Sequence, residues 1–184
     1  FFKTLRRLFF YFILKWFKWI YDSNFGFKVL IVGGGNAGIS TAAQLLRKKK
    51  DLQIAIIEPS EYHYYQPAWT MVGGGIYDID DTVKSEASVI PEGVTWIKEA
   101  VTGFAPDQNE VMLASGINVG YAYLVVAPGI QLNWNEVKGL AENIGKNGVC
   151  SNYSFATAPY TFECLKNSKS GRAIFTSPHT PVKC

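Results

Sequence analysis

A run of glycines between a short apolar stretch and an amphipathic segment restricts the fold of this 184-residue chain more than any other feature. Residues 28–32 (Lys-Val-Leu-Ile-Val) predict a strand that is buried on both faces of a parallel sheet. Residues 33–38 read Gly-Gly-Gly-Asn-Ala-Gly, which fits the spacing G-x-G-x-x-G. Residues 39–49 predict a helix, and residues 52–57 predict a second buried strand. This order predicts a Rossmann-like α/β fold of the kind that binds FAD or NAD(P).

Three of the glycines have separate roles in such a loop. Gly33 permits the tight turn after the strand, Gly35 lets the backbone approach a pyrophosphate, and Gly38 lets the helix pack closely on the strand. The helix N-terminus presents free N–H groups and a partial positive charge to the phosphates. Glu58 stands at the end of the second strand, 20 residues beyond Gly38. Its carboxylate can accept hydrogen bonds from both hydroxyls of a ribose and would repel a 2′-phosphate.

The segment after Glu58 favours FAD over NAD alone. Residues 61–69 are dense in aromatic side chains, and Pro67 together with the glycines 73–75 prevents the regular helix that usually follows in an NAD-binding unit. We expect an irregular aromatic loop here, suited to a ligand with a larger ring system. His63 lies inside this loop, and we interpret it as a packing residue.

Further along the chain, the sequence predicts more strands. Residues 94–101 are interpreted as one strand, and Asp107 to Asn109 as a hairpin turn. The apolar residues 121–127 predict a buried strand that ends in Pro128-Gly129. Gly129 would bring the backbone towards the phosphates a second time. Residues 173–176 are interpreted as the first strand of a further unit.

Charge is concentrated at the start of the chain. The first 21 residues hold five cations and no acid, whereas the whole chain carries only +3. The globular part is therefore slightly acidic, which excludes a strongly basic nucleic-acid module. In residues 1–21 the longest uncharged run, 8–14, is far shorter than the roughly 18 residues that span a bilayer. A mitochondrial-type targeting helix and a helix anchored at a membrane surface both remain open.

The domain organisation follows from these shifts in pattern. We predict a basic amphipathic segment at residues 1–26, an FAD-binding domain at 27–168, and the start of a second dinucleotide-binding-like domain at 169–184. Three cysteines are too few for a secreted disulfide scaffold. No residues are assigned to a metal.

Several stretches in this order resemble the sulfide:quinone oxidoreductases of the eukaryotic mitochondrial type. The matching stretches are VLIVGGGNAGIS, IIEPSEYHYYQPAWTMVGGG, ASVIPEGVTWIKEAVT, YLVVAPGIQL, CSNYS and IFTSPHTPVKC. They recur in order across residues 27–184. EPSEYHYYQPAWT and TPVKC are much more specific to that family than the glycine motif, which flavoproteins share generally.

The resemblance implies a flavoprotein with two dinucleotide-binding domains, of which this chain holds the first part. It also implies FAD as cofactor, hydrogen sulfide as substrate, ubiquinone as electron acceptor, and a sulfur acceptor of the glutathione or sulfite type. The expected location is the surface of the mitochondrial inner membrane. Carried over by position, the expected FAD contacts are Asn36, Ala37, Glu58, Gln66 and Val101, and Cys184 is one of two redox cysteines.

The surroundings of Cys184 suit that role. Lys183 beside it favours the thiolate, and Pro178 and Pro181 stiffen the loop. For Cys150, a redox role and a packing role both remain open. Cys164 lies in a helix-like stretch, residues 160–167, and is interpreted as a packing residue or an inert, partly exposed thiol.

Two alternatives stand beside this interpretation. A type II NADH:quinone dehydrogenase would share the fold but needs no redox cysteine, and a non-catalytic FAD-binding remnant would not turn over at all. In the favoured mechanism, hydrosulfide attacks a disulfide between Cys184 and a second cysteine that is not in this sequence. We therefore expect these 184 residues alone not to turn over.

Overall fold

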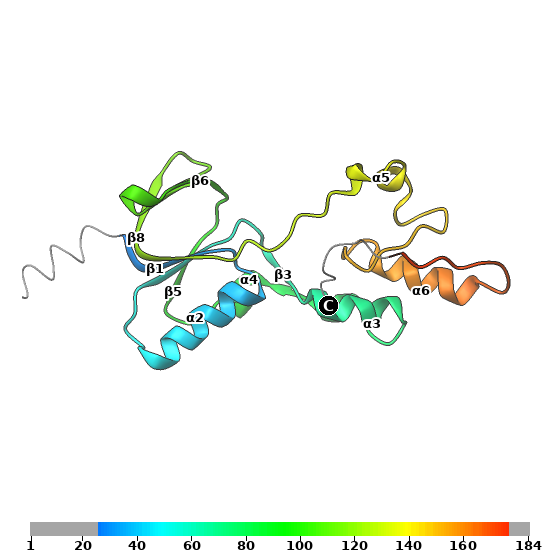
Figure 1. Ribbon diagram of the computed structural model, residues 1–184. Coiled ribbons are helices and arrows are strands. Elements are labelled where there is room, and N and C mark those ends of the chain that lie inside the picture. Colours follow the sequence, from blue (N-terminus) through cyan, green and yellow to red (C-terminus); the bar gives the residue numbers. More distant parts are fainter. Residues whose placement is uncertain (1–25, 177–184) are drawn as a thin grey trace, which may run out of the picture. The chain divides into compact units, whose positions relative to one another are not determined.

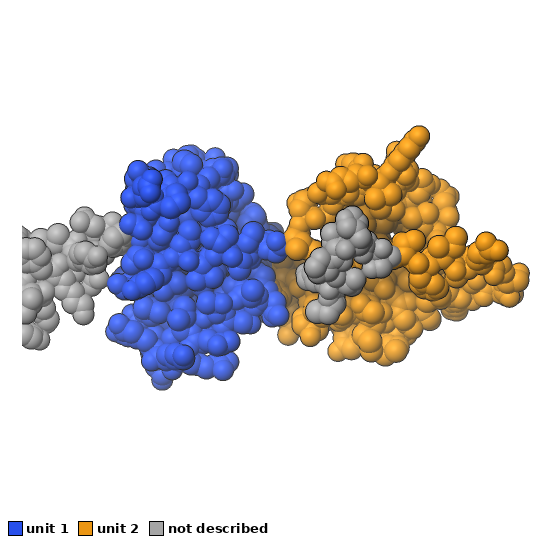
Figure 2. All heavy atoms as spheres, viewed as in Figure 1, with its two compact units in different colours: residues 1–61, 86–129 blue, residues 62–85, 130–184 orange. Residues whose placement is uncertain are grey.

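A computed structural model of the chain describes residues 26–176, and Figure 1 labels its elements. Most of the basic segment predicted at residues 1–26, together with Cys184, lies outside the described residues. The chain divides into two compact units, with residues 1–61 and 86–129 in the first and residues 62–85 and 130–184 in the second (Figure 2). The domain boundary predicted at residue 168 stays a prediction.

The first unit is built on a six-stranded sheet in the order β5-β2-β1-β8-β7-β6. Its strands are β1 (Phe27–Val32), β2 (Ile54–Ile57), β5 (Val94–Ile97), β6 (Val101–Ala105), β7 (Glu110–Leu113) and β8 (Asn118–Val126). Strands β5, β2, β1 and β8 pair in parallel, whereas β8, β7 and β6 form an antiparallel meander. The helix α2 (Asn36–Lys48) connects β1 to β2. The predicted strand–helix–strand unit is therefore confirmed.

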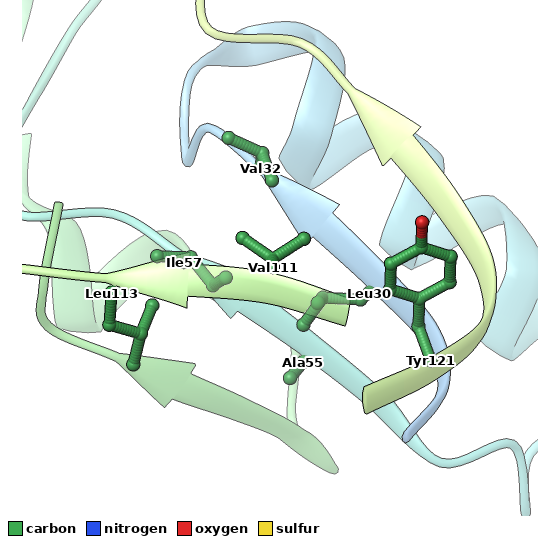
Figure 3. Packing of buried hydrophobic residues seen from close by; sticks show 7 residues of the cluster. All are labelled: Leu30, Val32, Ala55, Ile57, Val111, Leu113 and Tyr121. Atoms are coloured by element: carbon green, nitrogen blue, oxygen red, sulfur yellow. The ribbon is translucent and has the colours of Figure 1, made fainter. Parts of the chain in front are cut away.

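Alternation along β1 and β2 gives the sheet two buried faces, because successive side chains of a strand point to opposite sides. On one face the helix α2 packs through Ala42 on β1 and β2, which contribute Val29, Ile31, Ile54 and Ile56. On the other face, Figure 3 shows the cluster formed by Leu30, Val32, Ala55, Ile57, Val111, Leu113 and Tyr121. The antiparallel meander supplies the last three of these residues, so it covers the face that α2 leaves open.

The prediction of one strand over residues 94–101 is wrong. The structure has β5 up to Ile97 and a new strand, β6, from Val101. Between them the backbone N–H of Glu99 donates to the carbonyl of Ile97 at 2.9 Å, which closes a tight turn. The turn lets the chain leave the parallel edge beside β2 and join the antiparallel edge beside β7. The sequence is apolar on both sides of the turn, so its pattern hides the break.

The predicted hairpin turn is confirmed. A 3₁₀ turn, η3 (Pro106–Gln108), ends at Asn109 in the left-handed conformation, with φ of 55°. The strand predicted at residues 121–127 starts three residues earlier, at Asn118, because the first part of β8 pairs with β7 while the rest pairs with β1. The first unit also contains the short helix α4 (Glu86–Val89).

The second unit corrects the expectation of an irregular aromatic loop. The strands β3 (Tyr62–Tyr64) and β4 (Val83–Ser85) form an antiparallel ribbon, in which His63 lies opposite Lys84. The other elements of this unit are η1 (Gln66–Ala68), α3 (Trp69–Gly73), η2 (Asp80–Thr82), η4 (Trp134–Glu136), α5 (Leu140–Asn143) and α6 (Ala158–Asn167). Pro67 occupies the first turn of η1, where its missing N–H costs nothing. The ribbon was not predicted because its two strands lie about twenty residues apart in the sequence.

The core of the second unit is small and aromatic. It consists of Trp69, Val72 and Ala158, with Ile79 and Phe155 packed against it. The indole N–H of Trp69 donates to the hydroxyl of Thr82 at 3.0 Å, so the buried ring keeps its hydrogen bond. This contact ties α3 to the end of η2.

The strand expected at residues 173–176 is not formed; these residues lie in irregular, exposed chain. A strand needs a neighbour for its hydrogen bonds, and among residues 26–176 none is paired with this segment. Within the same described range, no helix has the length and apolar character that crossing a bilayer requires.

Replacing Ile56 by alanine is expected to lower the free energy of unfolding by about 2–5 kcal/mol, because the side chain is fully buried between β2 and α2. The matched control is Ile117→Ala in the same unit, where the side chain is 59% exposed. That variant should change stability by less than about 1 kcal/mol. Urea unfolding followed by circular dichroism measures both, and equal losses would contradict the assignment of the core.

Candidate dinucleotide site

The turn after β1 can be made only by a glycine. Gly33 has φ of +102°, and a methyl group on it would lie 2.2 Å from the carbonyl oxygen of Ala127. Its N–H donates to the carbonyl of Ile57 at 2.9 Å, and Ala127 donates to the carbonyl of Val32 at 2.8 Å. The three parallel strands β2, β1 and β8 thus hold the start of the glycine loop from both sides.

Gly38 sets how closely α2 approaches β1. A methyl group on Gly38 would lie 1.9 Å from the carbonyl oxygen of Gly33 and 3.2 Å from Cγ2 of Ile31. Because the first of these atoms belongs to the backbone, it cannot move aside without shifting the loop. The first turn of the helix is therefore seated directly on the turn that follows the strand.

Gly35 contrasts with both of these glycines. It precedes the first residue of α2, its φ of −68° suits any residue, and a methyl group placed on it would have nothing within 4 Å. Gly35, Asn36 and Ala37 are all exposed. The open space beside Gly35 is what the close approach of a phosphate requires.

The start of α2 favours an anion. The first bond of the helix runs from the N–H of Ile39 to the carbonyl of Gly35 at 3.1 Å, so the N–H groups before it have no acceptor inside the helix. No side chain caps this end, and the first turn contains no acidic residue. Arg47 and Lys48 lie in the last turn, which is the end that cations stabilise.

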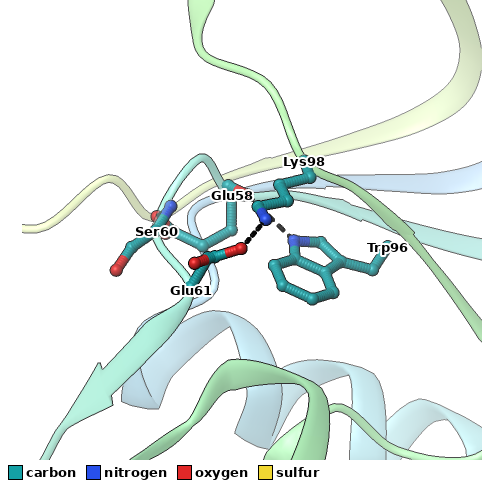
Figure 4. A network of polar contacts seen from close by, with 5 residues as sticks. All are labelled: Glu58, Ser60, Glu61, Trp96 and Lys98. Carbon is teal, nitrogen blue, oxygen red and sulfur yellow. Dashed lines mark hydrogen bonds and ion pairs between the residues drawn. The ribbon is translucent and has the colours of Figure 1, made fainter.

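Glu58 is held in place by backbone N–H groups. Its Oε2 accepts a hydrogen bond from Gly34 and its Oε1 accepts one from Ser60, both at 2.8 Å. Its carbonyl oxygen accepts the indole N–H of Trp96 at 2.8 Å, as Figure 4 shows. Each carboxylate oxygen has a second lone pair. The carboxylate is therefore oriented beside the glycine loop and still able to accept hydroxyl groups.

A surface network lies beside Glu58. Lys98 forms an ion pair with Glu61, and its ammonium group lies 5.7 Å from the centre of the Trp96 ring (Figure 4). Both charged side chains are about half exposed or more, so the ion pair itself adds little stability. The network links the segment after β2 to the end of β5.

A second glutamate near the loop was missed by the sequence analysis. Glu86, the first residue of α4, is only 1% exposed, and its N–H donates to the carbonyl of Glu61 at 2.8 Å. A methyl group on Gly34 would lie 2.3 Å from Oε1 of Glu86 and 2.7 Å from Cγ of Glu58. The side chains of both glutamates therefore pack closely against Gly34 and leave no room for a side chain there. No motif marks Glu86, since only the return of the chain after the ribbon brings it here.

The remaining site residues predicted from the sequence are spread over the structure. Val101 is the half-buried first residue of β6, opposite Leu113. Gly129 follows β8, is exposed and has φ of +79°. Gln66 belongs to the second unit, where its side-chain amide lies 3.5 Å from the carbonyl of Tyr153. The part of these residues in binding a cofactor stays a prediction.

No metal centre is visible between residues 26 and 176, where no three His, Cys, Asp or Glu side chains are grouped so that they could hold an ion.

The comparison with known proteins agrees with this geometry. Residues 27–158 match the sequence profile of the family described as pyridine nucleotide-disulphide oxidoreductase. Because the match covers more than half of the chain, the chain belongs to that family. The predicted Rossmann-like α/β fold is thereby confirmed.

Within this class the chain is similar to sulfide:quinone oxidoreductases. The mitochondrial enzyme of Dictyostelium discoideum is 54% identical over 159 residues, which make up 85% of this chain and 35% of that protein. The mitochondrial enzyme of Mus musculus is 44% identical over 158 residues, 86% of this chain and 35% of that protein. The resemblance predicted from the motifs is confirmed. The chain spans about a third of the length of these relatives.

The chain is also similar to solved structures of a sulfide:quinone oxidoreductase and of another oxidoreductase. The sulfide:quinone oxidoreductase of Aquifex aeolicus is 30% identical, with a TM-score of 0.64 over 76% of this chain and 31% of that one. The NADH:rubredoxin oxidoreductase of Clostridium acetobutylicum is 29% identical, with a TM-score of 0.52 over 77% of this chain and 36% of that one.

Two glycine variants distinguish an effect on the stability of the fold from an effect on dinucleotide binding. Gly35→Ala is expected to leave stability within about 0.5 kcal/mol of the original, because the new methyl group meets no atom and the backbone angles are ordinary. The same methyl group is expected to weaken the binding of a dinucleotide, measured with FAD, by about tenfold or more, because it occupies the space that a phosphate needs.

Gly38→Ala is the matched comparison. Its methyl group meets the backbone of Gly33, so we expect a loss of about 1–3 kcal/mol in unfolding free energy. Thermal unfolding and titration with FAD measure the two variants. Unchanged affinity in Gly35→Ala would show that the phosphates do not lie against this loop.

Proposed function

We propose that the chain binds FAD, with the pyrophosphate at the start of α2 and the adenosine ribose on Glu58. The observation that carries this proposal is the open position beside Gly35, in a loop whose neighbours Gly33 and Gly38 leave no room for a side chain. A pyrophosphate there would accept hydrogen bonds from the free N–H groups of the helix. The two ribose hydroxyls would donate to the carboxylate of Glu58, which Gly34 and Ser60 hold in position.

The loop suits either dinucleotide, and we prefer FAD over NAD because the resemblance to sulfide:quinone oxidoreductases implies FAD as the cofactor. Among the residues predicted to contact FAD, Asn36 and Ala37 are exposed at the first turn of α2. Gln66, Val101 and Gly129 complete the proposed set.

The activity we propose is the oxidation of hydrogen sulfide with a quinone as electron acceptor, carried out by the natural protein that contains this sequence. The mitochondrial relatives that are 54% and 44% identical carry the name sulfide:quinone oxidoreductase. Their names also support a mitochondrial location. We extend the proposal to ubiquinone as the quinone, to a sulfur acceptor of the glutathione or sulfite type, and to the surface of the inner membrane.

In this mechanism Cys184 is one partner of a redox disulfide, and Lys183 beside it favours the thiolate. Hydrosulfide attacks the disulfide, so one cysteine sulfur becomes a persulfide and the other leaves as a thiolate. The sulfur acceptor takes the outer sulfur of the persulfide, which leaves two cysteine thiolates. These thiolates give up two electrons when they close into the disulfide again, and a bound flavin would supply the acceptor for these electrons on the way to the quinone. The residues described above hold the dinucleotide end of the cofactor during these steps.

Glu58→Gln tests the cofactor assignment. The amide can offer only one acceptor oxygen to the ribose and the two backbone N–H groups, so the affinity for FAD should fall by about tenfold or more. Glu92→Gln, on an exposed residue of the same unit, is the control and should bind FAD as the original does. Flavin absorbance that stays with the protein after gel filtration measures the binding. If both variants bound FAD equally well, the proposal that Glu58 binds the ribose would be contradicted.

An anaerobic titration of the natural protein tests the activity. Sulfide, and not NADH, should bleach the absorbance of the bound flavin, and Cys184→Ser should slow that bleaching by at least about a hundredfold while FAD remains bound. Bleaching by NADH alone would instead identify a type II NADH:quinone dehydrogenase. A protein that binds FAD and responds to neither reductant would be a non-catalytic flavin-binding relative.

A further inference from the structure

Two cysteines of the second unit lie outside the proposed site. Cys150 is exposed and follows a short turn, whereas Cys164 is partly exposed and lies on α6. The turn is closed by the N–H of Gly145, which donates to the carbonyl of Val149, and by the N–H of Val149, which donates to Lys146, both at 2.9 Å. The backbone just before Cys150 is therefore ordered.

The helix α6 holds the backbone on both sides of Cys150. Before it, the N–H of Gly148 donates to the hydroxyl of Tyr160 at 3.0 Å. After it, the carbonyl of Ser151 accepts a hydrogen bond from the hydroxyl of Thr157 at 3.0 Å. These two contacts press the segment that carries Cys150 against the first half of α6.

The second thiol lies on the same side of this helix. Cys164 is four residues beyond Tyr160, and residues four apart are neighbours on a helix surface. The hydroxyl of Tyr160 accepts the N–H of Gly148, so this helix face lies next to the turn before Cys150. The Cys150 thiol in turn lies 3.8 Å from the carbonyl oxygen of Gly148. Both thiols therefore belong to one cluster around Tyr160.

The ionisation of Cys150 responds to this arrangement. Burial raises the pKa of its thiol first, and the neighbouring Cys164 thiol raises the pKa further through a hydrogen bond and through charge repulsion, while Thr161 lowers it. This agrees with the two hydrogen bonds that hold the segment carrying Cys150 against α6, the helix that carries Cys164. At neutral pH Cys150 is mostly protonated, so its reactions as a thiolate are slow.

We propose that Cys150 and Cys164 form a thiol pair that exchanges with small disulfides and closes into an intramolecular disulfide. This reaction is separate from the proposed sulfide chemistry, since it needs neither FAD nor Cys184. The exposed Cys150 is the residue that a small disulfide reaches first. Cys164, held beside it by α6, resolves the product.

The reaction balances in two steps. In the first, the Cys150 thiolate attacks one sulfur of the small disulfide, a sulfur–sulfur bond forms to Cys150, and the other half leaves as a thiolate with the electron pair. In the second, the Cys164 thiolate attacks the sulfur of Cys150, a bond forms between the two cysteine sulfurs, and the half that was attached to Cys150 leaves as a thiolate. The protein has lost two electrons and two protons, and the small disulfide has become two thiols.

The sequence offers a direct measurement. Trypsin cuts after Lys146 and Lys166 and nowhere between, so one peptide, residues 147–166, carries both cysteines and no others. The full chain is incubated with oxidised glutathione, the free thiols are alkylated, and the digest is analysed by mass spectrometry. We expect this peptide to be unalkylated and two hydrogen atoms lighter than its reduced form. A further cut after Glu163 should leave two pieces that separate only on reduction.

Two variants make the test specific. In Cys164→Ser the second step is blocked, so glutathione should remain attached to Cys150. In Cys184→Ser the internal disulfide should form as in the original chain, whether or not the proposed function is correct. The folded chain should close the disulfide at least about tenfold faster than the chain in denaturant, because the helix holds the thiols together.

Other results would overturn the proposal. They are a doubly alkylated peptide after oxidation, attachment of glutathione to both cysteines without closure, a disulfide from Cys150 to Cys184, or equal rates in the folded and denatured chain. Failure of FAD binding leaves this test unaffected, so the two proposals can be judged separately.

Discussion

The contact between the carbonyl of Gly33 and the Cα of Gly38 is the constraint on which the rest of the site depends. A side chain on Gly38 would come within 1.9 Å of that oxygen, and one on Gly33 would come within 2.2 Å of Ala127. These two bare positions let α2 start directly above the end of β1. The free N–H groups of its first turn are therefore brought to the carboxyl ends of the parallel strands, where such sheets bind their ligands. A helix set further back would leave the same groups facing only water.

Glu58 joins this contact to the neighbouring strand. It accepts hydrogen bonds from Gly34 in the loop and from Ser60 beyond β2, so the β1–α2 loop and the segment after β2 share one carboxylate. Glu86, which is almost wholly buried, also lies against Gly34. The carboxylate is thus preorganised in the absence of a ligand. Preorganisation reduces the loss of conformational entropy that accompanies binding.

Local patterns were sufficient wherever an element makes its contacts close by in the sequence. The apolar run of β1, the glycine spacing, the presence of a helix after it and the hairpin turn at Asn109 all follow from neighbouring residues, although α2 starts three residues before the predicted position. The prediction was wrong for residues 94–101. After Ile97 the chain passes from one edge of the sheet to the other, and the apolar pattern of the sequence does not change at that point. The prediction was also wrong for the aromatic segment, because the partner strand of Tyr62–Tyr64 is supplied by Val83–Ser85.

By itself the sequence determined the strand–glycine–helix–strand unit, the position of Glu58 and the family to which the chain belongs. These features depend on the spacing of residues along the chain, and that spacing can be read without knowing how the chain folds. Only the tertiary structure decided that Glu86 lies beside Gly34 and that the segment carrying Cys150 lies against α6. In both cases other segments of the chain separate the residues that meet. The pattern of apolar and polar residues does not predict where the chain comes back after those segments. Packing of distant segments, not local propensity, brings these side chains together.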